Sequence, residues 1–294
     1  MNKFDKSGSN LIFIISLPRS GSTMLQRLLG GHPEVLAVPE PWIMLHPLYA
    51  LKREGINTEY EAFQARQALD DFLEHTANGE ETYIEAIRLM ASTLYSSALQ
   101  ETGKNFFVDK TPRYFHIMPE LHRVFPKAKF VILLRNPIAV LSSVLKTWFN
   151  NQPEEFLKSY NQLDMAKGPG LLIEGIRALG DKAIVIRYEE LVTDPDTQIR
   201  WLSEQLGLTF TPQMLDYSNS KQPRGRFGDQ VSINARGTPV ENSVEKWRTS
   251  LSSKELAGFA QGYLGNLGRE LITKLGYDFD ELGSSLGNLT APTK

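Results

Sequence analysis

The stretch Leu11–Leu29, LIFIISLPRSGSTMLQRLL, decides the fold. Its first seven residues, Leu11–Leu17, form an apolar run rich in isoleucine, which is typical of a strand buried on both faces of a parallel sheet. After a polar turn, apolar residues return at helical spacing at Met24, Leu25 and Leu28. The sequence therefore predicts a strand, a tight turn and a helix in direct succession.

The turn between that strand and that helix has the composition of an anion-binding site. The first turn of a helix leaves backbone N–H groups unpaired, and the helix dipole places positive potential there. Glycine lets the backbone close around an oxyanion, while arginine and hydroxyl side chains add donors. The residues that we expect to bind the anion are Arg19, Ser20, Gly21, Ser22, Thr23 and Met24.

The same turn differs from a P-loop that binds ATP or GTP. Such a loop reads G-x-x-x-x-G-K-[ST], with its lysine on the terminal phosphates. Here no glycine stands at the first position and no lysine follows Gly21. PRSGST instead resembles the loop P-[KR]-[ST]-G-[ST]-[ST] of the sulfotransferase family, which implies binding of the 5′-phosphate of 3′-phosphoadenosine 5′-phosphosulfate (PAPS). Because a sulfuryl group carries less charge than a terminal phosphoryl group, a side-chain cation can replace magnesium.

The composition is that of an ordinary globular protein. The chain has 294 residues, of which 41% are hydrophobic and 22% charged, and its net charge of −2 argues against nucleic-acid and membrane-surface partners. It contains no cysteine, and no cluster of histidine, aspartate and glutamate has metal-ligand spacing, so we expect no disulfide and no metal. Met1–Asn10 is polar, and the longest apolar run is far shorter than the roughly 20 residues of a membrane span. We therefore expect a cytoplasmic protein, whose oligomeric state the sequence leaves open.

A rigidly held carboxylate follows a short second strand, Val35–Val38, in the sequence Pro39-Glu40-Pro41. Each proline fixes its own φ and restricts the residue before it. The segment HPEVLAVPE resembles the matching stretch of tyrosylprotein sulfotransferases, and this resemblance implies that Glu40 is the general base. The alternative is a turn carboxylate that caps the helix expected to begin near Trp42. His46 and His116 are reserve candidates for the base.

A buried-looking strand, Phe106–Val108, leads into Asp109-Lys110-Thr111-Pro112. Open α/β sheets bind ligands at the carboxyl ends of their strands, and a cation there can offset charge on a leaving phosphate. DKTP resembles the [DE]-K-[ST]-P element of carbohydrate and bacterial sulfotransferases. The resemblance implies that Lys110 reaches the transferring sulfuryl group. The alternative is a surface lysine paired with Asp109.

The strand Lys129–Leu134 leads to a second predicted anion site. Arg135 ends the strand, Asn136 suits the N-cap of the next helix, and Ser143 lies about 10 Å further along that helix. Arg135 and Ser143 can therefore converge on one anion beside the helix start. Their spacing resembles the R-x7-S element of sulfotransferases, which implies a grip on the 3′-phosphate of PAPS.

Two further segments resemble nucleotide-binding parts of the family. RYEEL follows the strand Ala183–Ile186, and the resemblance implies that Tyr188 stacks on or hydrogen-bonds the adenine; a core tyrosine is the alternative. Arg224–Asp229 partly resembles the loop that folds over the 3′-phosphate, which implies roles for Arg224 and Gly225. The first arginine and the Trp-Lys end of that loop are missing here, and a surface loop is the alternative.

Helical periodicity covers much of the remaining chain. Residues 52–101 contain four basic and ten acidic residues, a net charge of −6, which fits either a solvated face or a cover that favours neutral or cationic acceptors. The helical pattern over 150–180 is expected to break at Lys167-Gly168-Pro169-Gly170. A last helix is expected over 253–275, with a flexible tail beyond Gly283.

Together the motifs predict one sulfotransferase domain over residues 1–294, with a three-layer, P-loop-like α/β fold and a mostly parallel sheet flanked by helices. Residues 42–101 would form a helical insert on the acceptor side, and 221–239 a loop over the nucleotide. The expected reaction moves the sulfuryl group of PAPS to a hydroxyl or amine of a small-molecule acceptor of the kind met in secondary metabolism. It releases adenosine 3′,5′-bisphosphate (PAP), with Glu40 as base and with Arg19 and Lys110 stabilising charge. Carbohydrate or protein-tyrosine sulfation, a P-loop phosphotransferase and a non-catalytic nucleotide-binding module are the alternatives.

Overall fold

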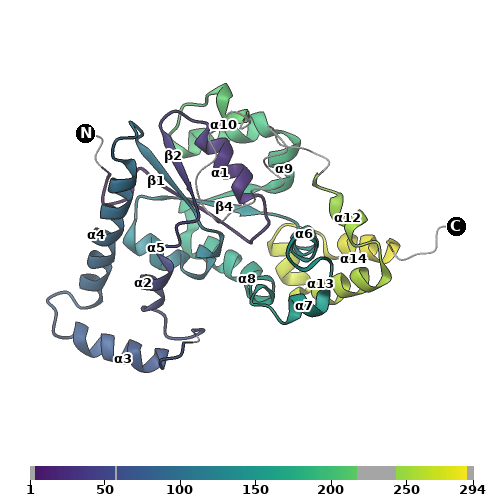
Figure 1. Cartoon of the computed structure of the whole chain (residues 1–294), viewed down its shortest axis with the longest axis horizontal. Helices are drawn as coiled ribbons and strands as arrows, with labels where there is room; N and C mark the ends of the chain where they lie inside the picture. The colour runs from purple at the N-terminus through teal and green to yellow at the C-terminus, as the bar shows by residue number, and fades with distance from the viewer. Residues whose placement is uncertain (1–3, 57, 217–242, 290–294) are drawn as a thin grey trace.

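A parallel sheet forms the centre of the computed structural model, which describes residues 4–56, 58–216 and 243–289 (Figure 1). Within these residues the strand order is β2-β3-β1-β4-β5, and every neighbouring pair is parallel. The strands are β1 (Leu11–Ser16), β2 (Val35–Pro39), β3 (Phe106–Lys110), β4 (Lys129–Leu134) and β5 (Ala183–Arg187). Because β1 is central and the chain turns to opposite sides of it, ligand-binding turns are expected at its carboxyl end.

Helices cover both faces of this sheet, which confirms the predicted three-layer α/β fold (Figure 1). Phe13 and Ile15 of β1 are buried in one hydrophobic cluster, while Ile12 and Ile14 are buried in another. This alternation is the period-two pattern of a strand that is covered on both sides. The helices of the first cluster include α4 (Glu80–Leu99), α5 (Met118–Val124), α6 (Pro137–Phe149), α8 (Asn161–Leu179), α13 (Lys254–Lys274) and α14 (Phe279–Asn288), and those of the second are α1 (Ser22–Gly30), α9 (Tyr188–Thr193) and α10 (Pro195–Leu206).

Short helices complete the connections. They are α2 (Leu45–Tyr49), α3 (Ala62–Leu73), α7 (Pro153–Leu157), α12 (Lys246–Ser250) and the 3-10 turns η1 (Pro112–His116), η2 (Gly180–Lys182) and η3 (Pro212–Leu215). The helical character expected over 42–101 is confirmed by α2, α3 and α4, with Gly79 between α3 and α4. Part of the acidic charge of this segment is paired with basic residues, because Glu80 and Glu81 of α4 contact Arg123 of α5.

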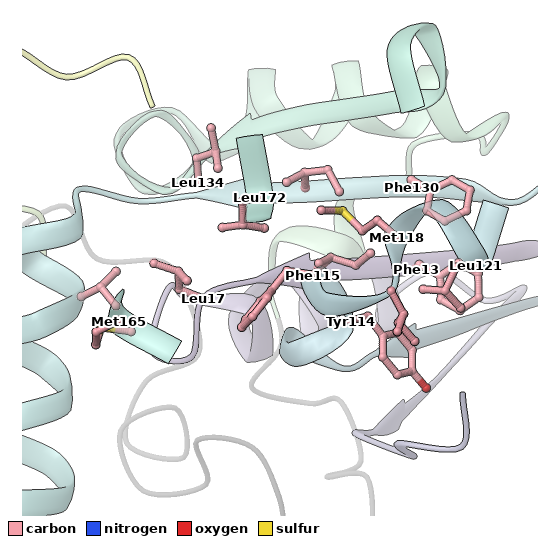
Figure 2. Packing of buried hydrophobic residues seen from close by; sticks show 14 of the residues in the cluster. Phe13, Leu17, Tyr114, Phe115, Met118, Leu121, Phe130, Leu134, Met165 and Leu172 are labelled. Atoms are coloured by element: carbon pink, nitrogen blue, oxygen red, sulfur yellow. The ribbon is translucent and has the colours of Figure 1, made fainter. Parts of the chain in front are cut away.

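Aromatic rings pack together in the hydrophobic cluster on one face of the sheet (Figure 2). The ring of Phe13 stacks on Phe130 of β4, with centroids 5.4 Å apart, and meets Tyr114 of η1 edge-on at 5.9 Å. Met118 of α5 lies against α8, where a side chain at Gly175 would come within 1.7 Å of its methyl carbon. This packing fixes η1, and therefore the segment that follows Lys110, against the central strands.

The predicted break at Lys167–Gly170 is wrong, because α8 runs without interruption from Asn161 to Leu179. Gly168 is required by close packing, since a Cβ there would lie 2.5 Å from Leu17. Pro169 has no N–H to donate to the carbonyl of Met165 one turn earlier. That carbonyl instead accepts a hydrogen bond of 3.1 Å from the buried hydroxyl of Tyr263 on α13. Tertiary contacts therefore override the local helix-breaking signal.

The C-terminal region differs from the sequence prediction in one respect. Helix α13 matches the helix expected over 253–275, but the flexible tail predicted beyond Gly283 is wrong as far as Asn288, because α14 continues to that residue. Leu282 and Leu286 bury one face of α14 in the core. The predicted nucleotide-covering loop at 221–239, with Arg224 and Gly225, lies outside the described residues.

Candidate active site

The turn after β1 provides an open helix N-terminus. Gly21 is the N-cap residue of α1 with φ +96°, a conformation that favours glycine, and no side chain in the described part of the chain caps the helix. Arg19 also has a positive φ, of +67°. Ser20 and Ser22 are buried, yet Ser20 Oγ has no hydrogen-bond partner among the described residues. A buried hydroxyl without a partner beside uncapped N–H groups fits an anion.

The second predicted anion site lies against the first. Arg135 Nη1 donates a hydrogen bond of 2.8 Å to the carbonyl of Arg19, and Arg19 Nε donates one of 3.2 Å to Ser143 Oγ. Asn136 caps α6 as expected, since its side chain accepts from the backbone N–H of Ile138 at 2.9 Å. The structure therefore brings Arg19, Arg135 and Ser143 together, as their positions after β1 and β4 predict.

Tyr188 lies between the turn after β1 and the turn after β4. The guanidinium of Arg135 is 4.0 Å from the centroid of the Tyr188 ring, and a Cβ on Gly21 would fall 2.5 Å from the same ring. The Tyr188 hydroxyl and Ser243 Oγ are 2.6 Å apart. Burial lowers the pKa of Arg135 below its usual value, and its Nε has no partner among the described residues. A donor that is buried and unsatisfied fits a phosphate oxygen at this place.

Lys110 connects the first anion site with Glu40. Its side chain is fully buried, and Nζ lies 2.8 Å from Glu40 Oε1 and 3.3 Å from Thr23 Oγ1 of α1. The sheet explains this meeting, because Lys110 stands opposite Pro39 in β2 and Ile14 in β1. The alternative of a surface lysine paired with Asp109 is therefore wrong.

Asp109, the residue before Lys110, is fixed by three hydroxyl groups. Its carboxylate accepts hydrogen bonds from the hydroxyls of Tyr95 at 2.7 Å, Tyr114 at 3.0 Å and Thr111 at 2.8 Å. Burial raises the pKa of Asp109 to about 6, although these hydrogen bonds and Lys110 oppose the rise. The network joins α4, β3 and η1 beneath the site.

The second carboxylate oxygen of Glu40 contacts Trp42, a residue that the sequence prediction did not include in the site. Its indole Nε1 donates a hydrogen bond of 3.2 Å to Glu40 Oε2. The guanidinium of Arg113 lies over the indole, 5.3 Å from the ring centroid. Glu40 does not cap a helix, since α2 begins at Leu45 with Met44 as its N-cap. In the sequence, the contact between Trp42 and Glu40 is indicated only by the presence of an aromatic residue two positions after the glutamate.

The two reserve histidines differ in their surroundings. His46 is exposed on α2. His116 is half-buried between the rings of Phe115 and Tyr49. Burial, with the nearby charges of Lys52, Arg113 and Lys167, lowers the pKa of His116 to about 4. Glu40 is the better candidate for the base because of its position, since it bonds Lys110, which also bonds Thr23 at the start of α1.

Comparison with known proteins identifies the family. Residues 11–212 match the model of the Sulfotransferase family, so the chain belongs to that family and the expectation from its motifs is confirmed at this level. The chain is 32% identical over 290 residues to the nodulation protein NoeE of Sinorhizobium fredii, an alignment that covers 91% of this chain and 66% of NoeE. It is 25% identical over 216 residues to protein-tyrosine sulfotransferase A of Caenorhabditis elegans, with 71% of this chain and 53% of that protein covered.

Both relatives are therefore longer than the region they share with this chain, which spans less than two thirds of either. Among solved structures, the sulfotransferase domain from the curacin biosynthetic pathway aligns with a TM-score of 0.59 and 21% identity, over 91% of this chain and 97% of that domain. This likeness supports the fold. In the part of the chain that the structure describes, no helix is long and apolar enough to cross a bilayer, and no group of three or more histidine, aspartate and glutamate residues could hold a metal ion.

Proposed function

We propose that this protein transfers the sulfuryl group of PAPS to a hydroxyl or amine of a small-molecule acceptor, with Glu40 as the general base. The observation that carries the proposal is the position of Lys110 Nζ, which bonds both Thr23 at the start of α1 and the carboxylate of Glu40. One buried cation thus contacts both the turn that would bind phosphate and the carboxylate that would act as base.

The nucleotide would occupy the two anion sites. The turn Arg19–Met24 would hold the 5′-phosphate with its backbone N–H groups and the hydroxyls of Ser20, Ser22 and Thr23. Arg135 and Ser143 would hold the 3′-phosphate, which distinguishes this donor from an ordinary adenylate. The buried unpartnered atoms Ser20 Oγ and Arg135 Nε fit this assignment. Tyr188 would contact the adenine with an edge or its hydroxyl, since Arg135 covers one face of its ring.

The chain's own residues would supply base and charge stabilisation. Bound PAPS provides an activated sulfuryl group and a phosphate leaving group. Glu40 would take the proton from the acceptor hydroxyl or amine as that atom forms a bond to sulfur and the bond from sulfur to the bridging oxygen breaks. Arg19 and Lys110 would stabilise the negative charge that collects on the bridging oxygen and on the departing PAP.

The charge of residues 52–101 bears on the class of acceptor. The excess of acidic residues over 52–101 disfavours polyanionic acceptors such as sulfated polysaccharides. A neutral or cationic small molecule is the acceptor that this charge favours.

The test is a screen of small hydroxyl and amine acceptors with 35S-labelled PAPS. We expect label on at least one acceptor, and we expect Glu40→Gln to lower single-turnover transfer by about 100-fold or more. Binding of PAP without transfer to any acceptor would favour the non-catalytic nucleotide-binding module. Transfer of phosphate from ATP with magnesium would favour the phosphotransferase.

A second function follows from the names of several relatives, which are protein-tyrosine sulfotransferases from nematode, fly and fish. The same screen should therefore include an acidic peptide with one tyrosine and a simple saccharide. Labelling of the peptide in preference to every small molecule would assign the protein-tyrosine reaction, and labelling of the saccharide the carbohydrate reaction.

A further inference from the structure

We propose that Trp42 is a positioning residue that fixes the direction of the Glu40 carboxylate, and that Arg113 and Asp164 hold Trp42 in place. This inference rests on the proposed function, in which Glu40 is the base.

The two oxygens of the Glu40 carboxylate are held from different sides. Lys110 Nζ on β3 donates to Oε1 at 2.8 Å, and the indole Nε1 of Trp42 donates to Oε2 at 3.2 Å. The terminal torsion of a glutamate side chain is broad, so a carboxylate with one donor can rotate. Two donors on opposite oxygens remove that freedom. Each oxygen has a second lone pair that can accept a proton from the bound acceptor.

The backbone of Trp42 is in a conformation that few tryptophans adopt. Its φ is +57°, which crowds the Cβ of a residue other than glycine. Outliers of this kind persist where surrounding contacts determine them, and they gather at functional sites. Here the backbone N–H of Trp42 donates to Thr111 Oγ1 at 3.4 Å, and Thr111 Oγ1 donates to Asp109 at 2.8 Å. The main chain at Trp42 is thereby tied to the loop that carries Lys110.

The outer face of the indole is covered by a guanidinium that is itself fixed. Arg113 lies 5.3 Å from the ring centroid, and its Nε is 3.0 Å from each oxygen of Asp164 on α8. Arg113 Nη2 also donates to Asp164 Oδ2 at 2.5 Å and to Asn161 at 3.2 Å. A forked arginine–carboxylate pair is geometrically specific, and the cation is attracted to the face of the indole. The charged groups Lys110 and Asp164 thus flank the Glu40–Trp42–Arg113 unit at its two ends.

The test compares Trp42→Phe with the wild-type enzyme. Phenylalanine keeps an aromatic face for Arg113 but removes the N–H. Loss of one hydrogen bond to a charged group predicts a fall in kcat of about tenfold. The KM for PAPS should stay within about twofold, so that the loss falls on kcat. Trp201→Phe, on the exposed side of α10, is the matched control and should behave as wild type.

A double-mutant cycle separates positioning from a merely structural role. In the Glu40→Gln background, Trp42→Phe should cause little further loss, because the carboxylate that it orients is gone. An equal tenfold loss in both backgrounds would overturn the proposal, as would an unchanged kcat in Trp42→Phe. If Trp42→Phe does not fold, Arg113→Gln gives the second measurement, and an unchanged kcat there has the same meaning.

An NMR measurement that does not depend on turnover tests this inference separately from the proposed function. In the 1H–15N NMR spectrum, the Trp42 indole resonance is assigned by its absence in Trp42→Phe. Glu40→Gln should move that resonance upfield, since a neutral amide is a weaker acceptor than a carboxylate. An unmoved resonance would refute the contact even in an active enzyme. Full transfer by Glu40→Gln with a moved resonance would refute Glu40 as base while leaving the contact in place.

Discussion

The carbonyl oxygen of Arg19 accepts a hydrogen bond of 2.8 Å from Arg135 Nη1, across 116 residues of sequence. The turn after β1 and the turn after β4 are therefore directly joined. Two anion sites that touch can hold two phosphates of one molecule at a fixed separation. This contact is the structural reason to expect a doubly phosphorylated adenosine in preference to a nucleotide with only a 5′-phosphate.

Substitution of Arg135 should change nucleotide selectivity. Arg135→Gln removes a charge-assisted contact worth about 1.5–3 kcal/mol, so PAP should bind roughly 10- to 150-fold more weakly, while the already weaker binding of AMP changes little. Isothermal titration calorimetry with both nucleotides measures this difference. Arg269→Gln, which disrupts only the exposed pair with Asp280, is the control. Equal losses for PAP and AMP would mean that Arg135 does not contact the 3′-phosphate.

Gly21→Ala should damage the site through Tyr188. Alanine is strained at φ +96°, and its Cβ would lie 2.5 Å from the Tyr188 ring, on which Arg135 stacks. We expect the loss of PAP binding together with a destabilisation of more than about 1 kcal/mol, measured by calorimetry and urea unfolding.

Gly258→Ala is the matched control for that change. Gly258 lies within α13, where nothing comes within 4 Å of an added Cβ and φ is not positive. Alanine there should stabilise the protein by about 0.5–1 kcal/mol and leave PAP binding unchanged. A Gly21→Ala protein that binds PAP like the Gly258→Ala protein would contradict the tight packing at the turn.

Much of the site could be predicted because each element of it is local in sequence. Arg19–Thr23 follows one buried strand, Lys110 ends another, and Arg135 follows a third. Parallel strands bring their carboxyl ends to one edge of the sheet. The N-cap at Asn136 could also be predicted, because capping is a property of adjacent residues.

The parts that failed depend on contacts between distant residues. Nothing near Trp42 in the sequence indicates that Arg113 will cover its ring or that its φ will be positive. Likewise, Gly168-Pro169 has the local composition of a break, and only the packing of Leu17 and the hydroxyl of Tyr263 explain why the helix continues. Local rules describe the start of each element, whereas long-range partners decide whether a weak local signal prevails.

Asp109 should make stability depend on pH in an unusual direction. Its folded-state pKa of about 6 is above the ordinary value of 3.8, so the folded state binds the proton more tightly. The resulting stabilisation is complete below pH 3.8 and is lost as the pH rises through about 6, a change of about 3 kcal/mol. Asp109→Asn should lack this contribution. The stability of the wild type minus that of the variant should therefore fall by most of that amount between pH 4 and pH 7 in urea titrations.

The exposed residue Asp71 gives the control for the pH series, because Asp71→Asn should shift stability by the same small amount at both pH values. A flat difference for Asp109→Asn would show that the pKa of Asp109 is not raised in the folded protein. That result would also mean that the hydroxyls of Tyr95 and Tyr114 and the charge of Lys110 together offset the effect of burial.

The hydroxyl of Tyr263 should contribute more to the free energy of unfolding than that of a typical buried tyrosine, because Pro169 has no N–H to donate to the Met165 carbonyl. Tyr263→Phe leaves the Met165 carbonyl without a donor inside a buried helix, at a cost of about 1–3 kcal/mol in urea unfolding. In a Pro169→Ala background the same change should cost less, since the N–H of alanine can donate to that carbonyl. The two changes should therefore show a coupling energy of about 1 kcal/mol, whereas Tyr160→Phe, at an exposed position, should show none. Equal costs of Tyr263→Phe in the two backgrounds would mean that the continuity of α8 rests on the packing of Gly168 alone.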